Sequence, residues 1–93
     1  MDDDKSLYTT RDLGLATTLL THGMELKTVD LQYEGSRRNP IGYWTFSDTQ
    51  ALQRVVKDYW SGSCRVDPRN FLSNMRALKT MVVQVEKAPK ISQ

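Results

Sequence analysis

The feature that most constrains the fold is a change in hydrophobic period near the middle of the chain. Between residues 25 and 33 apolar side chains alternate with polar ones, and residues 41–46 are rich in β-favouring aromatics. The polar stretch between them, which includes Gly35 and Pro40, is short enough for an antiparallel connection. Sequences on either side have helical spacing instead. The chain therefore predicts a β-hairpin packed against helices.

Two of the predicted helices have start signals in short polar motifs. The first helix covers about residues 11–22, with Thr9 as its cap and Gly23 as its left-handed stop. The second follows a capping box in which Ser47 caps the helix and Gln50 reciprocates. Both helices are amphipathic, so each is expected to bury one face.

The third helix has the clearest start, because an acidic cap, Asp67, is followed by Pro68 at the first helical position. Its apolar stripe consists of Phe71, Leu72, Met75, Leu78, Met81, Val82 and Val85. A short extended stretch at Leu7 and Tyr8 precedes the first helix. The order is β-α-β-β-α-α, which predicts an α+β fold: a small antiparallel three-stranded sheet with three helices packed on one face.

The chain of 93 residues, 39% of them hydrophobic, fits one domain. We expect this domain at residues 6–86, after a disordered tail at 1–5 that resembles a cleavage tag and before a flexible basic tail at 87–93. A single cysteine and the lack of a signal-like segment favour the cytoplasm, or the host cytoplasm for a phage protein. Apolar runs are too short for a membrane helix, so no membrane partner is expected.

Two residues that often carry chemistry occur once each. His22 ends the first helix, where a cation interacts favourably with the helix terminus, and Cys64 precedes Arg65, whose charge could activate a thiol. A catalytic cysteine needs a base, and His22 is the only imidazole available. Nothing in the sequence brings the two together, so structural roles are predicted for both. An enzyme would require them within hydrogen-bond reach; otherwise the sequence predicts no enzyme, metal site or cofactor.

The charges point to a binding role. Acids concentrate in the first third of the chain and bases in the rest, which hints at an anionic partner for the basic part. The candidate phosphate contacts lie in the hairpin turn, just before the third helix and on that helix: Arg37, Arg38, Arg65, Arg69, Arg76 and Lys79. We expect a non-enzymatic accessory protein that engages nucleic acid or a nucleoprotein complex. The competing interpretation is an ordinary solvated helix face, because Asp58, Asp67 and Glu86 interrupt the run.

Two aromatics support an alternative partner. Tyr43 and Trp44 point to opposite faces of their strand, so one of them must leave the helix-covered face. An exposed ring there can stack on a base or anchor a protein, although such rings more often pack against a loop. The alternative function is therefore a protein–protein adaptor or a phage-type inhibitor. It would use these aromatics, or Val83 and Ile91, to bind a partner or to form a homodimer.

The sequence also resembles an uncharacterised family of small bacterial and phage domains over most of residues 6–85. The residues that carry the resemblance are Tyr8-Thr9-Thr10-Arg11-Asp12-Leu13-Gly14-Leu15-Ala16, Gly23, Tyr59-Trp60, Val66-Asp67-Pro68-Arg69-Asn70-Phe71-Leu72 and Leu78-Lys79. The resemblance implies a stand-alone domain. It implies no activity and no site residues.

Overall fold

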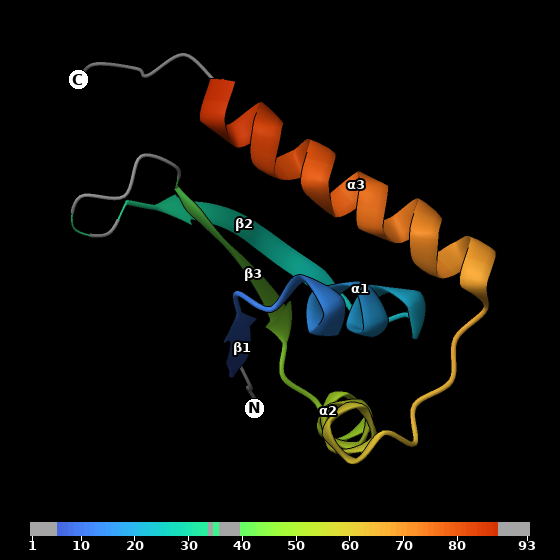
Figure 1. Ribbon diagram of the computed structural model, residues 1–93. Helices are drawn as coiled ribbons and strands as arrows, with labels where there is room; N and C mark the ends of the chain where they lie inside the picture. The colour runs from blue at the N-terminus through green and yellow to red at the C-terminus, as the bar shows by residue number, and fades with distance from the viewer. Residues whose placement is uncertain (1–5, 34, 36–39, 88–93) are drawn as a thin grey trace.

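Figure 1 shows a computed structural model of the chain, which describes residues 6–33, 35 and 40–87. The elements in chain order are β1 (Leu7–Thr10), α1 (Leu13–Thr21), β2 (Leu26–Gln32), β3 (Ile41–Ser47), α2 (Gln50–Ser61) and α3 (Pro68–Lys87). The predicted α+β class and the β-α-β-β-α-α order are confirmed. The predicted tail at 1–5, and residues 88–93 of the predicted C-terminal tail, lie outside the described residues.

The sheet is antiparallel with β3 at its centre, in the order β1-β3-β2. On β3, Phe46 pairs with Tyr8 of β1 and with Leu26 of β2. Trp44 lies two residues earlier on the same face and pairs with Val29 of β2. A register shift after Leu26 adds one residue to β2, so Leu26 and Val29 face the same side although they are three residues apart. The helix-covered face of the sheet is thereby apolar.

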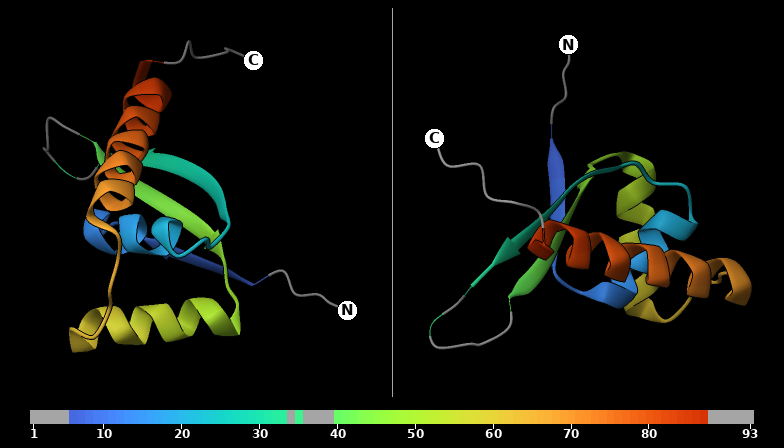
Figure 2. Two further views of the ribbon diagram at one scale, coloured as in Figure 1. Left: turned by 90° about the vertical axis from the view of Figure 1, so that its right-hand side faces the viewer. Right: turned by 90° about the horizontal axis from the view of Figure 1, so that it is seen from above.

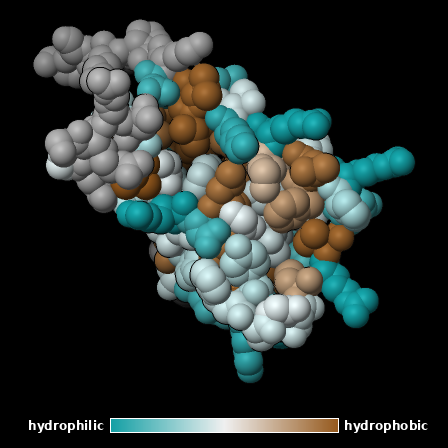
Figure 3. Space-filling view, viewed as in Figure 1, coloured by the Kyte–Doolittle hydropathy of each residue, from teal (hydrophilic) through white to brown (hydrophobic). Residues whose placement is uncertain are grey.

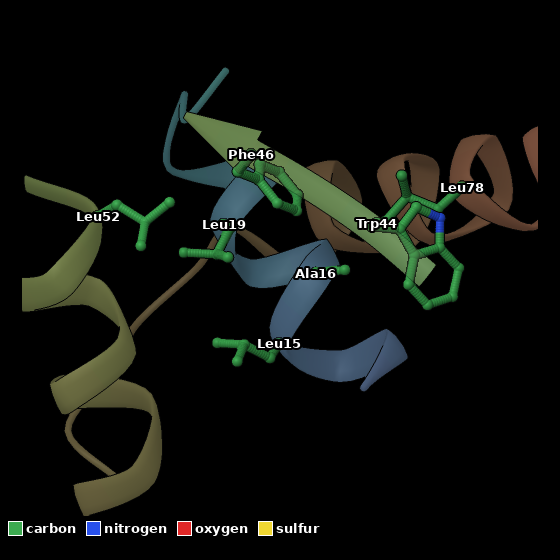
Figure 4. Close-up of a cluster of buried hydrophobic side chains, with 7 residues drawn as sticks. All are labelled: Leu15, Ala16, Leu19, Trp44, Phe46, Leu52 and Leu78. Carbon is green, nitrogen blue, oxygen red and sulfur yellow. The ribbon is translucent and has the colours of Figure 1, made fainter. Parts of the chain in front are cut away.

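The hydrophobic core joins β3 to all three helices, as the close-up in Figure 4 shows. Its buried members are Leu15, Ala16, Leu19, Trp44, Phe46, Leu52 and Leu78. In Figures 1 and 2, α1 lies between α2 and α3, and α3 also runs along β2. The core is therefore built around α1 and β3, and α2 closes it from one side.

The start of α1 differs from the prediction. Asp12, rather than Thr9, caps the helix, because its Oδ1 accepts a hydrogen bond from the amide of Leu15 at 3.0 Å. Thr9 belongs to β1, where its hydroxyl is 2.9 Å from that of Thr45 on β3. The sheet pairing removes Thr9 from the helix terminus. The predicted stop at Gly23 is confirmed, with φ of +84°.

The cap of α2 is also displaced. Thr49, rather than Ser47, caps the helix by accepting a hydrogen bond from the amide of Leu52 at 3.0 Å. Ser47 stays in β3, where its hydroxyl donates to Glu25 at 3.1 Å. For α3 the prediction holds, since Asp67 accepts from the amide of Arg69 at 2.9 Å. Among the described residues, no helix combines the length and apolarity needed to cross a bilayer.

Candidate functional site

Four cations lie on α3 or immediately before it, and we call them the basic face: Arg65, Arg69, Arg76 and Lys79. All four side chains are exposed. Arg69 and Arg76 are seven residues apart, which places them two helical turns apart on one side. Leu78 is fully buried on the opposite side of the helix. The amphipathic pattern that buries Leu78 therefore also turns Arg69, Arg76 and Lys79 toward solvent.

The cations of the basic face form no ion pair with any carboxylate in the described part of the chain. The ion pair found between described residues joins Lys27 and Glu25 at 3.4 Å and involves no residue of α3. Asp67 could have neutralised Arg69, but its carboxylate caps the helix through the backbone amide of that residue. The charges of the basic face are therefore available to an external anion.

Apolar side chains interrupt the basic face. Leu72 and Val83 are 52% and 43% exposed on the same side of α3 as Arg76. Leu72 was expected in the buried apolar stripe of α3. The surface through which α3 packs on α1 and β2 is narrower than that stripe, so Leu72 remains exposed to solvent. Figure 3 shows this mixture of hydrophilic and hydrophobic side chains along the edge that α3 forms.

The candidate binding residues predicted in the hairpin have different outcomes. Arg37 and Arg38 lie outside the described residues. Trp44 is 5% exposed and belongs to the core, so it offers no surface to a partner. Tyr43 faces the other side of the sheet and is half-buried.

The most exposed tryptophan lies elsewhere, on α2. Trp60 was expected on the apolar face of that helix, but it is 65% exposed and stands edge-on to Tyr59, with ring centroids 5.0 Å apart. The outer side of α2 also exposes Arg54 and Lys57, which are not among the predicted contacts. Their three-residue spacing, on the side of the helix opposite Leu52 and Tyr59, could have indicated from the sequence that they are exposed together.

Tyr59 joins α2 to the start of α1. Its hydroxyl donates to Oδ1 of Asp12 at 3.3 Å. Burial raises the pKa of Tyr59 above its ordinary value, and the nearby Asp12 carboxylate raises it further by charge and by accepting this hydrogen bond. This contact positions α2; it lies apart from the basic face.

His22 and Cys64 are within hydrogen-bond distance, a contact that nothing in the sequence had indicated and that the enzyme alternative required. The sulfur of Cys64 is 3.3 Å from Nε2 of His22, although the residues are 42 positions apart. His22 caps the C-terminus of α1, and Cys64 lies in the segment between α2 and α3. Within residues 6–33, 35 and 40–87, no three His, Cys, Asp or Glu side chains converge as a metal site.

Comparison with known proteins locates the chain in a family. Neither curated proteins nor solved structures give a match. One family model, described as a domain of unknown function (DUF5659), matches residues 5–84. The matched region runs from β1 through most of α3 and includes the whole core. The chain therefore belongs to the DUF5659 family of domains of unknown function.

Proposed function

We propose that this protein is a non-enzymatic accessory protein that binds nucleic acid, alone or within a nucleoprotein complex. The basic face of α3 would contact the phosphates, together with Arg37 and Arg38 of the segment between β2 and β3. The observation that carries the proposal is the set of exposed cations on α3 that no described carboxylate neutralises. A cytoplasmic location is part of the same proposal.

The spacing of the cations suits a phosphate backbone. Arg69 and Arg76 are separated by about 10 Å along the helix axis, at 1.5 Å per residue. This length corresponds to about three base-pair steps of a duplex at 3.4 Å each. Contacts of this kind supply affinity and orientation but little sequence preference. We therefore propose a binder with weak sequence selectivity.

Salt dependence is the sharpest test, because each neutralised phosphate releases counterions. The four contacts of the basic face alone predict that log K falls against log salt with a slope of about −3.6 on duplex DNA, and about −2.8 on a single strand. With Arg37 and Arg38 included, the six contacts predict slopes of about −5.4 and about −4.2. Fluorescence anisotropy with a labelled duplex and a labelled single strand, between about 50 and 200 mM salt, measures both slopes. The stronger of the two ligands identifies the nucleic-acid form.

A matched pair of variants separates the basic face from overall charge. Arg76→Gln should weaken binding and reduce the slope by about 0.9. Arg54→Gln makes the same charge change on the outer side of α2 and should leave the slope nearly unchanged. Undetectable binding at low salt, a flat salt dependence, or equal effects of the two variants would refute the proposal.

The exposed Leu72 and Val83 support the second candidate, a protein–protein adaptor or homodimer. Arginines mixed with apolar side chains are typical of protein interfaces. Tyr43 faces the opposite side of the sheet and would make a separate contact, whereas Ile91 lies outside the described residues. Under this alternative, Val83→Ser would abolish partner binding or dissociate a dimer measured by light scattering, and Arg76→Gln would have little effect.

A further inference from the structure

We propose that Cys64 and His22 form a thiol–imidazole pair that makes Cys64 a site of reversible modification by low-molecular-weight disulfides. The distance of 3.3 Å between the sulfur and Nε2 is within hydrogen-bond range for sulfur. A nucleophile and a base in such contact are the usual signature of an activated thiol. The proposal does not depend on nucleic-acid binding.

The fold holds His22 in place by backbone contacts. The His22 amide donates to the carbonyl of Thr18 at 3.0 Å, and the next two amides donate to Leu20 and Leu19, each at 3.0 Å. Gly23 then turns the chain with φ of +84°. The imidazole is therefore presented from a fixed helix end rather than from a free loop.

The segment that carries Cys64 is anchored at both ends. On the α2 side, the amide of Ser63 donates to the carbonyl of Asp58 at 2.9 Å. On the α3 side, Asp67 caps the helix. A third contact ties α3 to the end of α1, where Asn74 donates to the hydroxyl of Thr21 at 3.0 Å. These contacts bring the thiol to the imidazole by tertiary packing.

The pair is accessible to a reagent. Cys64 is half-buried and His22 is exposed, whereas cysteines buried in a core are generally inert. Among the described residues, the imidazole has no other hydrogen-bond or ion-pair partner. Nε2 is therefore directed at the thiol alone.

The chemistry is a thiol–disulfide exchange. His22 accepts the Cys64 proton as the sulfur attacks one sulfur of the disulfide. A new S–S bond forms, the reagent's S–S bond breaks, and its other half leaves as a thiolate. The imidazolium passes its proton to solvent, or to the leaving thiolate where that thiolate is the stronger base. One disulfide is consumed and one formed, so no further oxidant is required. A free thiol reverses the reaction by the same route.

The test uses 5,5′-dithiobis(2-nitrobenzoate), an aromatic disulfide whose released thiolate absorbs visible light. Because the chain has one cysteine, each released thiolate reports Cys64. Wild type should react roughly tenfold faster than His22→Gln near pH 7. This rate enhancement is smaller than that of a general base in an enclosed active site, because His22 is exposed. The two rates should converge above about pH 9.5, where an ordinary thiol ionises without a base.

Two further variants keep the test decisive. His22→Asn should react as slowly as His22→Gln and retains a residue suited to a helix end. Ser63→Ala, next to the thiol, should react like wild type. Equal rates for wild type and His22→Gln near pH 7, a rate ratio that stays constant with pH, or an equal loss in Ser63→Ala would overturn the proposal. Circular dichroism verifies that each variant is folded.

Discussion

The helices α1 and α2 have similar lengths but very different surroundings. Five consecutive residues of α1, Leu15 to Leu19, are buried, whereas α2 buries Leu52 alone. The reason is position, because α1 lies between α2 and α3 and α2 packs on one side of α1 (Figure 1). The comparison teaches that periodicity identifies which face of a helix is apolar, but it does not reveal how many faces the fold covers.

Polar residues are accommodated in α1 because the helix itself satisfies them. Thr17 and Thr18 are buried, and their hydroxyls donate to the carbonyls of Leu13 at 2.7 Å and Gly14 at 2.8 Å. Buried hydroxyls without such partners would cost free energy. A helix of mixed sequence can therefore lie at the centre of this domain.

The largest expected effect on stability comes from truncating a buried side chain of α1 at the centre of the core. Leu19→Ala in α1 should lower the free energy of unfolding by about 3 kcal/mol, because the fully buried side chain leaves a cavity. Urea denaturation measures the change. Leu72→Ala, at an exposed site on α3, is the control and should change stability by no more than about 0.5 kcal/mol. Similar losses in both variants would contradict the assignment of the core.

Leu52→Ala tests how α2 is held. The same side-chain truncation should cost about 2 kcal/mol, at the lower limit for such changes, because α2 can relax outward. Hydrogen exchange should show lost protection in α2 while β3 stays protected. A uniform loss of protection across both elements would mean that α2 is as integral to the fold as α1.

Gly14→Ala tests the second contact between the two helices. An added Cβ would stand 2.6 Å from the Tyr59 hydroxyl, so the Tyr59 side chain or α2 must shift and the hydrogen bond to Asp12 is broken. We expect a loss of about 1 kcal/mol by thermal or urea unfolding. In a Tyr59→Phe background the 2.6 Å contact is gone, and Asp12 Oδ1, 3.3 Å from the added Cβ, is the nearest remaining atom. The cost of alanine should therefore fall to within about 0.5 kcal/mol of zero. An unchanged cost in the double variant would disprove the steric explanation.

Tyr59→Phe should have the smallest effect at neutral pH, a loss of at most about 1 kcal/mol. Its pH dependence is more informative. Because the folded pKa of Tyr59 lies above the ordinary value of 10.0, its contribution is complete below pH 10.0 and is lost as pH rises through the folded pKa. Wild type should therefore lose stability more steeply than Tyr59→Phe above that pH. Parallel curves would show that the hydroxyl has no coupling to folding.

Much of the fold follows from local signals. The hairpin period, the glycine stop at Gly23 and the Asp67-Pro68 start of α3 were predicted and are present. The caps of α1 and α2 were misplaced, because Thr9 and Ser47 also suit strands and the sheet recruited both. A capping motif competes with strand pairing, and the outcome depends on a partner strand distant in sequence.

The features of the candidate sites also fall into two groups, those that follow from local sequence and those that depend on tertiary packing. The outward direction of Arg69 and Arg76 follows from helical period, since these residues lie opposite Leu78. The exposure of Trp60 and the burial of Trp44 did not follow, because both depend on where other elements end. The contact of Cys64 with His22 is the extreme case, joining segments 42 residues apart.

The sequence by itself determined the element types, their order and the side of α3 that carries charge, because these depend on residues a few positions apart. Tertiary structure decided which faces are covered, which residues cap α1 and α2, and which thiol meets which imidazole. These features require segments distant in the chain to pack together, and local spacing holds no information on that packing.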